Sequence, residues 1–131
     1  MATEGGGLGP FDISMEATAT LATKQYFAVI ADSSNPHKCV IAGANGKVIG
    51  ILQNKPAAGE TAIVRTGGVS KHSMGEASMT PGDLVTATAD GDGEQVDAAG
   101  EFFYGILLTN ADDGDIASIL VTQGVAHASD A

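Results

Sequence analysis

The side chains that could do chemistry in this chain are few and far apart. Histidine occurs at positions 37, 72 and 127, and the single cysteine is Cys39. No histidine has a Cys, Asp or Glu partner at the spacing that zinc ligands use, so we expect His37, His72 and His127 to be exposed polar residues. A lone cysteine excludes an intramolecular disulfide, and we interpret Cys39 as a small buried strand residue of a chain made in a reducing cytosol.

Two acidic segments resemble fragments of a calcium loop. These are Asp90-Gly91-Asp92-Gly93-Glu94 and Asp112-Asp113-Gly114-Asp115, in which nearby carboxylates could wrap a hard cation. The first lacks the Glu at the twelfth position of an EF-hand, and Asp-Gly is also a common hairpin turn. We therefore expect plain acidic turns and no metal site.

Catalytic signatures are absent from the sequence. It contains no G-x-S-x-G elbow, no H-E-x-x-H, no phosphate loop ending in Gly-Lys-Ser/Thr and no dinucleotide fingerprint. Catalysis needs a nucleophile beside a base, a pair of carboxylates or a metal with an open position. The sequence therefore predicts a protein that is not an enzyme, with no catalytic residue and no cofactor.

Charge is distributed unevenly along the chain. The six basic residues all lie in residues 1–71, where there are five acids, whereas residues 72–131 contain eleven acids and neither Lys nor Arg. The net charge of −10 repels nucleic-acid phosphate, which argues against DNA or RNA binding. No apolar run approaches the roughly 20 residues that cross a bilayer, and the first residues lack the basic start of a secretion signal, so we expect neither membrane insertion nor export.

The elements that must position these residues are short strands. Apolar residues make up 44% of the chain and charged residues 17%, and 18 glycines punctuate it, which is the pattern of barrels and sandwiches. We predict an all-β fold, a small barrel or sandwich of about eight short strands, with one helical turn at Ser73–Met79. The predicted strands are Gln25–Ala31, Lys38–Ala42, Lys47–Gln53, Thr61–Val69, Asp83–Ala89, Gln95–Ala98, Phe102–Thr109 and Asp115–Thr122.

An internal repeat is visible in the sequence. Gly50-Ile51-Leu52 and the following Gly59-Glu60 recur at one constant offset as Gly105-Ile106-Leu107 and Gly114-Asp115. Two weaker parallels join Ala31-Asp32 with Ala89-Asp90 and Gly68-Val69 with Gly124-Val125. The body therefore reads as two related halves of four strands each, unless two Gly-rich hairpins are similar by chance.

Residues 1–20 differ in composition from the rest. Glu4–Pro10 is typical of a flexible arm, and an alternating apolar pattern follows it. We predict a flexible N-terminal arm over residues 1–20 and one β-rich domain over residues 21–131. The apolar side chains of the arm would anchor it on a shell or a neighbouring subunit, unless the arm is a frayed terminus. They are Leu8, Phe11, Ile13 and Met15.

The turn at Asn54-Lys55-Pro56-Ala57-Ala58-Gly59-Glu60 and the segments around it resemble the head decoration, or capsid cement, proteins of tailed bacteriophages. The Gly50-Ile51-Leu52 strand precedes that turn, Val64-Arg65 follows it, and Pro81-Gly82-Asp83 begins a later strand. Tyr104-Gly105-Ile106-Leu107 and Ile119-Leu120-Val121 match the way such sequences finish. The resemblance covers about residues 24–122.

This resemblance implies a structural protein that binds the outer surface of an assembled phage head and stabilises it. The implied partners are the major capsid protein and further copies of the chain, as a homotrimer or a dimer. The implied location is the outer capsid surface of the virion, after synthesis in the host cytoplasm. A second interface candidate is the turn with its neighbouring strand, that is Asn54, Lys55, Pro56 and Arg65.

An alternative is a small β-barrel module of a phage particle that binds a ligand or a carbohydrate. Sugar stacking uses exposed aromatic rings, and the chain has no Trp and two Tyr, Tyr26 and Tyr104, both inside predicted strands. The sequence therefore favours the decoration protein.

Overall fold

The computed structural model describes residues 10–127, and within them the chain forms nine strands and no helix. The fold is all-β, as predicted, and no described segment is a helix long and apolar enough to span a membrane. The strands are β1 (Phe11–Ala17), β2 (Ala28–Ala31), β3 (Lys38–Ile41), β4 (Gly50–Leu52), β5 (Thr61–Ser73), β6 (Leu84–Ala87), β7 (Gly93–Gln95), β8 (Phe102–Leu107) and β9 (Ile116–Val125).

The first five strands form a closed barrel. Strand β1 pairs with β3 in parallel and with the first part of β5 in antiparallel fashion, and β3, β2, β4 and β5 follow one another through antiparallel pairs. The ring therefore has no free edge, which is how small barrels satisfy the hydrogen-bonding groups of every strand.

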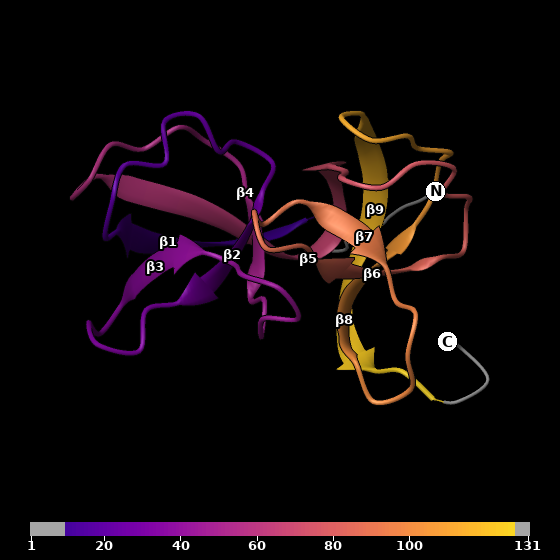
Figure 1. Ribbon diagram of the computed structural model, residues 1–131. Helices are drawn as coiled ribbons and strands as arrows, with labels where there is room; N and C mark the ends of the chain where they lie inside the picture. The colour runs from indigo at the N-terminus through magenta and orange to yellow at the C-terminus, as the bar shows by residue number, and fades with distance from the viewer. Residues whose placement is uncertain (1–9, 128–131) are drawn as a thin grey trace.

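A second barrel is built from the last part of β5 and the four later strands. The order β5-β9-β8-β6-β7 is antiparallel throughout, and a parallel bridge between Met74 and Gly93 joins β7 back to the chain after β5. Figure 1 shows the two barrels side by side, with β5 running from one into the other.

Strand registers confirm the internal repeat. Ile51 lies opposite Arg65 and Leu52 opposite Val64. At one constant offset, Ile106 lies opposite Leu120 and Leu107 opposite Ile119. The remaining strands correspond in the same way, β1 with the end of β5, β2 with β6 and β3 with β7, each pair with equivalent partners.

The repeating unit has five strands rather than the predicted four. Because β5 ends the first unit and begins the second, Gly68-Val69 opens the second repeat and does not correspond to Gly124-Val125. The register of β2 and β6 matches Ala31 with Ala87, not with Ala89. The predicted helical turn at Ser73–Met79 is also wrong, since this segment completes β5 and forms two bridges.

The predicted arm is wrong for its second half. Strand β1 closes the first barrel, Ala17 is fully buried, and Ile13 and Met15 pack against the barrel core. Alternation of apolar and polar residues, read as a sticky arm, is instead the pattern of a strand with one face in a core. The barrel domain therefore includes β1, and residues 1–9 lie outside the described part of the chain.

Two apolar cores hold the molecule together. One lies inside the first barrel, and the other fills the second barrel and continues into the contact between them, so the two barrels share buried surface. Members of the first core are Ala17, Leu21, Val29, Cys39, Leu52, Ala62 and Val64. First-repeat side chains in the shared core are Ala28, Ala42, Val48 and Ile51.

Gly50 and Gly105 occupy equivalent positions in the two repeats, but a methyl group added at each is expected to have different effects on stability. A Cβ on Gly50 would lie 2.2 Å from the Arg65 carbonyl oxygen, which is backbone, whereas a Cβ on Gly105 would first meet the flexible Cδ1 of Ile119 at 2.8 Å. Overpacking of this kind costs roughly 1–3 kcal/mol where side chains can move. We expect Gly50→Ala to lower the free energy of urea unfolding by more than about 3 kcal/mol, and Gly105→Ala by about 1 kcal/mol. Equal losses would contradict the close approach of β4 to β5.

Candidate interaction surface

Most of the cysteine, histidine and acidic side chains that could do chemistry have structural roles in the fold. Among the described residues no three His, Cys, Asp or Glu side chains lie together as metal ligands do. Cys39 is buried in β3, as predicted, and burial raises the pKa of its thiol. His37 and His127 are exposed, also as predicted.

His72 contradicts the expectation of exposure, because it is fully buried. Its Nδ1 lies 2.7 Å from the carbonyl oxygen of Tyr26, and its Nε2 lies 2.5 Å from the hydroxyl of Tyr104. A carbonyl can only accept, so Nδ1 carries the proton and Nε2 accepts from the Tyr104 hydroxyl. The ring therefore links the second barrel to the segment that precedes β2 in the first.

The surroundings of His72 keep it neutral. Burial lowers its pKa from 6.5 to about 4, against the opposing effects of the Tyr26 carbonyl and of Asp92. Tyr26 adopts a positive φ of 71°, and its carbonyl also accepts a 2.9 Å bond from the Ser73 amide. Two bonds to one carbonyl hold this uncommon backbone conformation and fix the barrels relative to each other.

Carboxylates in the acidic segments stabilise turns. Four turns share one form, in which the third residue is a glycine with positive φ and the fourth is an acid whose carboxylate accepts the amide N–H of the first. This glycine conformation and local hydrogen bond are typical of tight turns. The four turns are Ala57–Glu60, Thr80–Asp83, Ala98–Glu101 and Asp112–Asp115.

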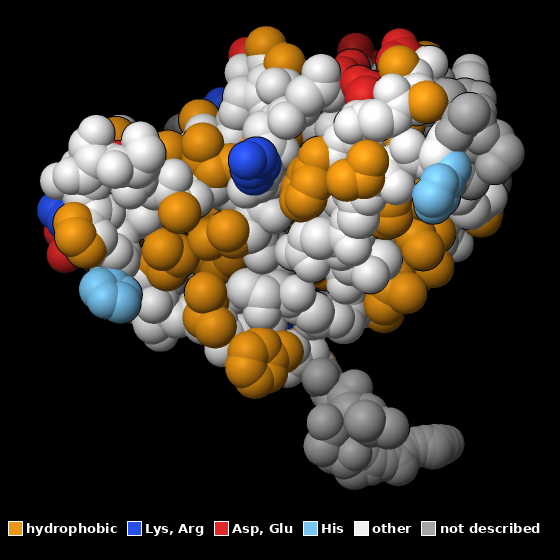
Figure 2. Space-filling view, turned by 90° about the horizontal axis from the view of Figure 1, so that it is seen from below, with side chains coloured by type: hydrophobic (Ala, Val, Ile, Leu, Met, Phe, Trp, Pro, Cys, Tyr) orange, Lys and Arg blue, Asp and Glu red, His pale blue; other side chains and the backbone are white. Residues whose placement is uncertain are grey.

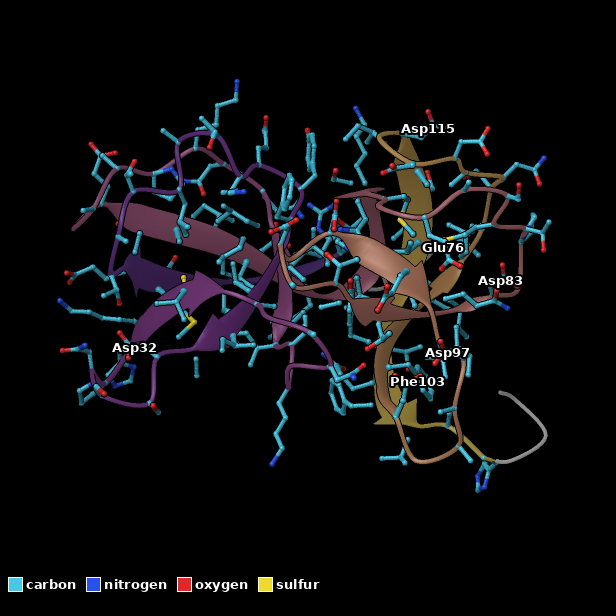
Figure 3. The ribbon with its side chains drawn as sticks, in the orientation of Figure 1. Asp32, Glu76, Asp83, Asp97, Phe103 and Asp115 are labelled. Carbon is cyan, nitrogen blue, oxygen red and sulfur yellow. The ribbon has the colours of Figure 1, made fainter. Side chains whose placement is uncertain are left out.

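The Asp90–Glu94 segment is likewise tied to its surroundings. The hydroxyl of Thr88 donates to the carboxylate of Asp92, and Glu76 accepts the amide of Gln95 at 2.6 Å. Burial raises the pKa of Glu94, and the charges of Glu76 and other acids add to this. Figure 3 shows the labelled acids Glu76, Asp83, Asp97 and Asp115 spread over the second barrel, not gathered in one site.

The predicted anchors of the arm differ in exposure, because β1 places some on the surface and others against the core. Phe11, at the start of the strand, is 66% exposed and available to a partner. Ile13 and Met15 pack into the first barrel, so they are not available to a partner. Leu8 lies outside the described residues.

The residues of the predicted interface turn also differ in exposure. The side chain of Asn54 donates to the Thr61 carbonyl and accepts the Ile63 amide, which locks the turn. Pro56 is buried, whereas Lys55 is exposed. Lys55 is therefore the residue of this turn that remains free to contact a partner.

Arg65 lies on the outer side of the first barrel, where it is paired with β1. Its Nε and Nη2 donate to the two carboxylate oxygens of Asp12 at 2.8 and 3.2 Å, and its Nη1 donates to the Val69 carbonyl. A two-point pair of this kind has fixed geometry, and it lowers the pKa of Asp12. Arg65 therefore joins β1 to β5, and its guanidinium is already paired with Asp12 instead of being free to contact a shell.

Sequence analysis missed a set of exposed apolar side chains on the second barrel. Val69 and Ile116 are each 52% exposed, Leu108 is 44% exposed and Leu120 38% exposed. The signal was present in β9, where apolar residues occupy both faces of the strand instead of alternating. One face of the molecule, seen in Figure 2, carries hydrophobic side chains over both halves, while the acidic ones lie near its edge.

Neither tyrosine offers a ring for stacking on a sugar. Tyr104 is fully buried, and the Lys71 ammonium lies 5.7 Å from the ring centre of Tyr26, which is partly buried. Nothing at these two residues favours the carbohydrate-binding alternative.

Comparison with known proteins identifies a shared fold. No family model matches the chain, and no curated protein matches it. A solved structure does, that of the N base of the head fiber gp8.5 in bacteriophage phi29, with a TM-score of 0.65 and 13% sequence identity. The match covers 86% of this chain and 94% of that one, so both barrels take part in the similarity.

The buried histidine predicts a loss of stability in mild acid. Because the pKa of His72 is about 4 in the folded chain and 6.5 when exposed, the unfolded chain binds the extra proton between these values. The contribution of His72 is complete above about pH 6.5 and falls by about 3 kcal/mol as the pH drops to about 4. In His72→Met/Tyr104→Phe, where Met copies the equivalent Met15 of the first repeat, urea unfolding should lose this dependence.

The matched control is His37→Gln, which removes an exposed histidine. Its unfolding free energy should follow the wild-type pH profile, since the substitution leaves the buried His72 and both of its hydrogen bonds in place. A wild-type profile that stays flat between pH 6.5 and 4 would refute the buried neutral His72.

Proposed function

We propose that this chain is a structural component of a tailed-phage head that attaches to the outer surface of the assembled shell and stabilises it. The observation that carries the proposal is the shared two-barrel fold, which spans nearly the whole of this chain and of a phage head-fiber base. The partner on the shell would be the major capsid protein.

The rigid join between the barrels supports a structural role. Besides the His72 contacts, the Asn45 amide donates to the Ala87 carbonyl and the Ala28 amide to the Gly91 carbonyl. At Gly91 a Cβ would lie 2.7 Å from Ile41 of the first barrel, so backbone and side chain are in close contact across the join. Contacts of this kind would hold the two barrels in one relative orientation, as a structural component requires.

The use made of the polar side chains supports a role without catalysis. The four acidic turns use their carboxylates on their own backbone amides, and the one fully buried histidine is hydrogen-bonded at both nitrogens. In the proposed role these groups hold turns and the contact between the barrels in place.

Charge supports an orientation in which the first barrel faces the shell. Lys38 and Arg65 are paired with Glu16 and Asp12, whereas Lys47 and Lys55 are exposed and form neither an ion pair nor a ring contact within the described residues. The acids of the second barrel would then face solvent, where like charges keep particles apart.

Sedimentation with heads of the phage that encodes the chain tests the attachment. Purified protein should sediment with expanded, mature heads and stay in the supernatant with unexpanded shells. Recovery in the supernatant with both would refute the proposed function.

The orientation predicts which surface charges matter for attachment. Reversing both free lysines in Lys47→Glu/Lys55→Glu should lower the occupancy of heads at least about tenfold, because charges at an interface govern encounter and register. The matched control, Asp90→Lys/Asp113→Lys, reverses two exposed acids of the second barrel and should retain or increase occupancy. If the control loses attachment as completely as the lysine variant, the second barrel faces the shell instead.

A further inference from the structure

The outward side of the second barrel carries a continuous apolar surface, which we call the outer apolar face. Val69 on β5 lies opposite Leu120 on β9, Leu120 opposite Ile106 on β8, and Ile106 opposite Leu84 on β6. Residues opposite one another in a sheet project to the same side. By strand alternation Ile116 and Leu108 project outward as well. Leu84 and Ile106 are only partly exposed, and β6 lies farther round the barrel, so the face consists of Val69, Leu108, Ile116 and Leu120.

The first repeat shows how this architecture treats the same positions when they meet solvent. Strand register makes Asp12 and Arg65 the equivalents of Val69 and Leu120. Asp12 and Arg65 form an ion pair with side chains that are 34% and 22% exposed. An exposed ion pair is well hydrated, whereas an exposed Val–Leu pair leaves apolar surface in water. The second repeat therefore carries apolar side chains where solvent contact alone would favour charged ones.

The first repeat also shows what such a surface does when it is apolar. Ile51 and Ala28 are the equivalents of Ile106 and Leu84, and both are fully buried against second-barrel side chains in the shared core. In the first repeat the β4 and β2 part of this row is thus covered by another barrel, while Asp12 and Arg65 meet solvent. In the second repeat the equivalents of Asp12 and Arg65, which are Val69 and Leu120, are exposed within a single chain.

The charges around the outer apolar face permit two copies to approach. The outward polar positions between its members are Lys71 and Ser118, Ser73 is buried beyond them, and no carboxylate stands among these residues. The Lys71 side chain lies over the Tyr26 ring instead of crossing the face. For a chain of net charge −10, contact between copies needs a surface free of opposed carboxylates, and this one meets that condition.

We propose that the outer apolar face is a self-association surface, covered by the same face of a second copy of this chain. A two-fold contact between identical copies brings a patch against itself, so the patch must be self-complementary, which an apolar patch without net like charge is. This inference goes beyond the proposed function and does not depend on it.

The dimensions fit the centre of an interface. With neighbouring strands about 4.8 Å apart, the three strands β5, β9 and β8 give the face a width of about 10 Å. From Ile116 to Leu120 the strand rises about 13 Å. This is the scale of an apolar centre that a polar rim surrounds, and association through it alone is expected to depend on protein concentration.

Analytical ultracentrifugation of the full chain without shells tests the proposal. Wild-type protein between about 1 µM and about 1 mM should exceed the mass of the 13.1 kDa monomer. In Val69→Asp/Leu120→Arg, which transplants the ion pair of the first repeat, the dissociation constant should rise at least about tenfold. The first repeat holds this pair at the same register, so the barrel can accommodate it.

A matched control places a charge on exposed apolar surface away from the face. Val125 at the end of β9 is 59% exposed, and Val125→Asp should associate as the wild type does. Circular dichroism and thermal unfolding verify that each variant is folded. If the transplanted pair prevents folding, Val69→Thr/Leu120→Thr keeps residues that fit a strand and should weaken association in the same direction.

Two results would overturn the proposal. One is a wild-type monomer over the whole concentration range, which would leave the face to the shell or to another protein. The other is a folded face variant that associates as strongly as the wild type, which would place the contact between copies elsewhere.

Discussion

Strand β5 belongs to two barrels at once, and this sharing determines how the rest of the molecule is arranged. Residues up to Gly67 pair with β1 and β4, and residues from Gly68 onward pair with β9. Gly68 has a φ of +87°, and a Cβ there would lie 3.0 Å from the Pro10 backbone, so the crossing needs a glycine. Because one continuous strand fixes the spacing of the barrels, surfaces near the crossing must be complementary, and the shared core and the His72 contacts supply that complementarity.

Duplication fixed the registers of the two barrels, whereas their side chains have diverged according to surroundings. Met15 and His72 occupy equivalent positions, one against an apolar core and the other between Tyr26 and Tyr104. The His72 ring donates a hydrogen bond to the Tyr26 carbonyl of the first barrel, which a methionine side chain could not do. The same reasoning separates the Asp12–Arg65 pair from Val69–Leu120: identical backbone positions carry charge in one barrel and apolar surface in the other. Backbone register is thus set by local pairing, and side-chain chemistry by what lies next to each barrel.

The sequence predicted what depends on local rules. Turns of the form Gly-acid were recognisable because positive φ favours glycine and the carboxylate bonds within four residues, and the repeat was visible through them. Contacts between residues far apart in the chain could not be predicted from the sequence. The burial of His72 depends on Tyr26 and Tyr104, distant in the chain, and β1 resembled an arm because its partners lie more than twenty residues away. The roles of Asn54, Pro56 and Arg65 also depended on neighbours that only the folded barrel brings close.

Divergence between the repeats gives the chain two ends of different surface chemistry. The first barrel is near neutral, closed by β1 and covered on one side by its partner barrel, and its free lysines lie at exposed turns. The second barrel holds most of the negative charge on its turns and an apolar surface on its sheet. Acids on the turns are compatible with an apolar sheet face because, within four-residue turns, each carboxylate bonds to its own backbone and stays off the sheet. A single fold, used twice, therefore presents two surfaces of different chemistry, one near neutral with exposed lysines and one acidic at its turns and apolar on its sheet.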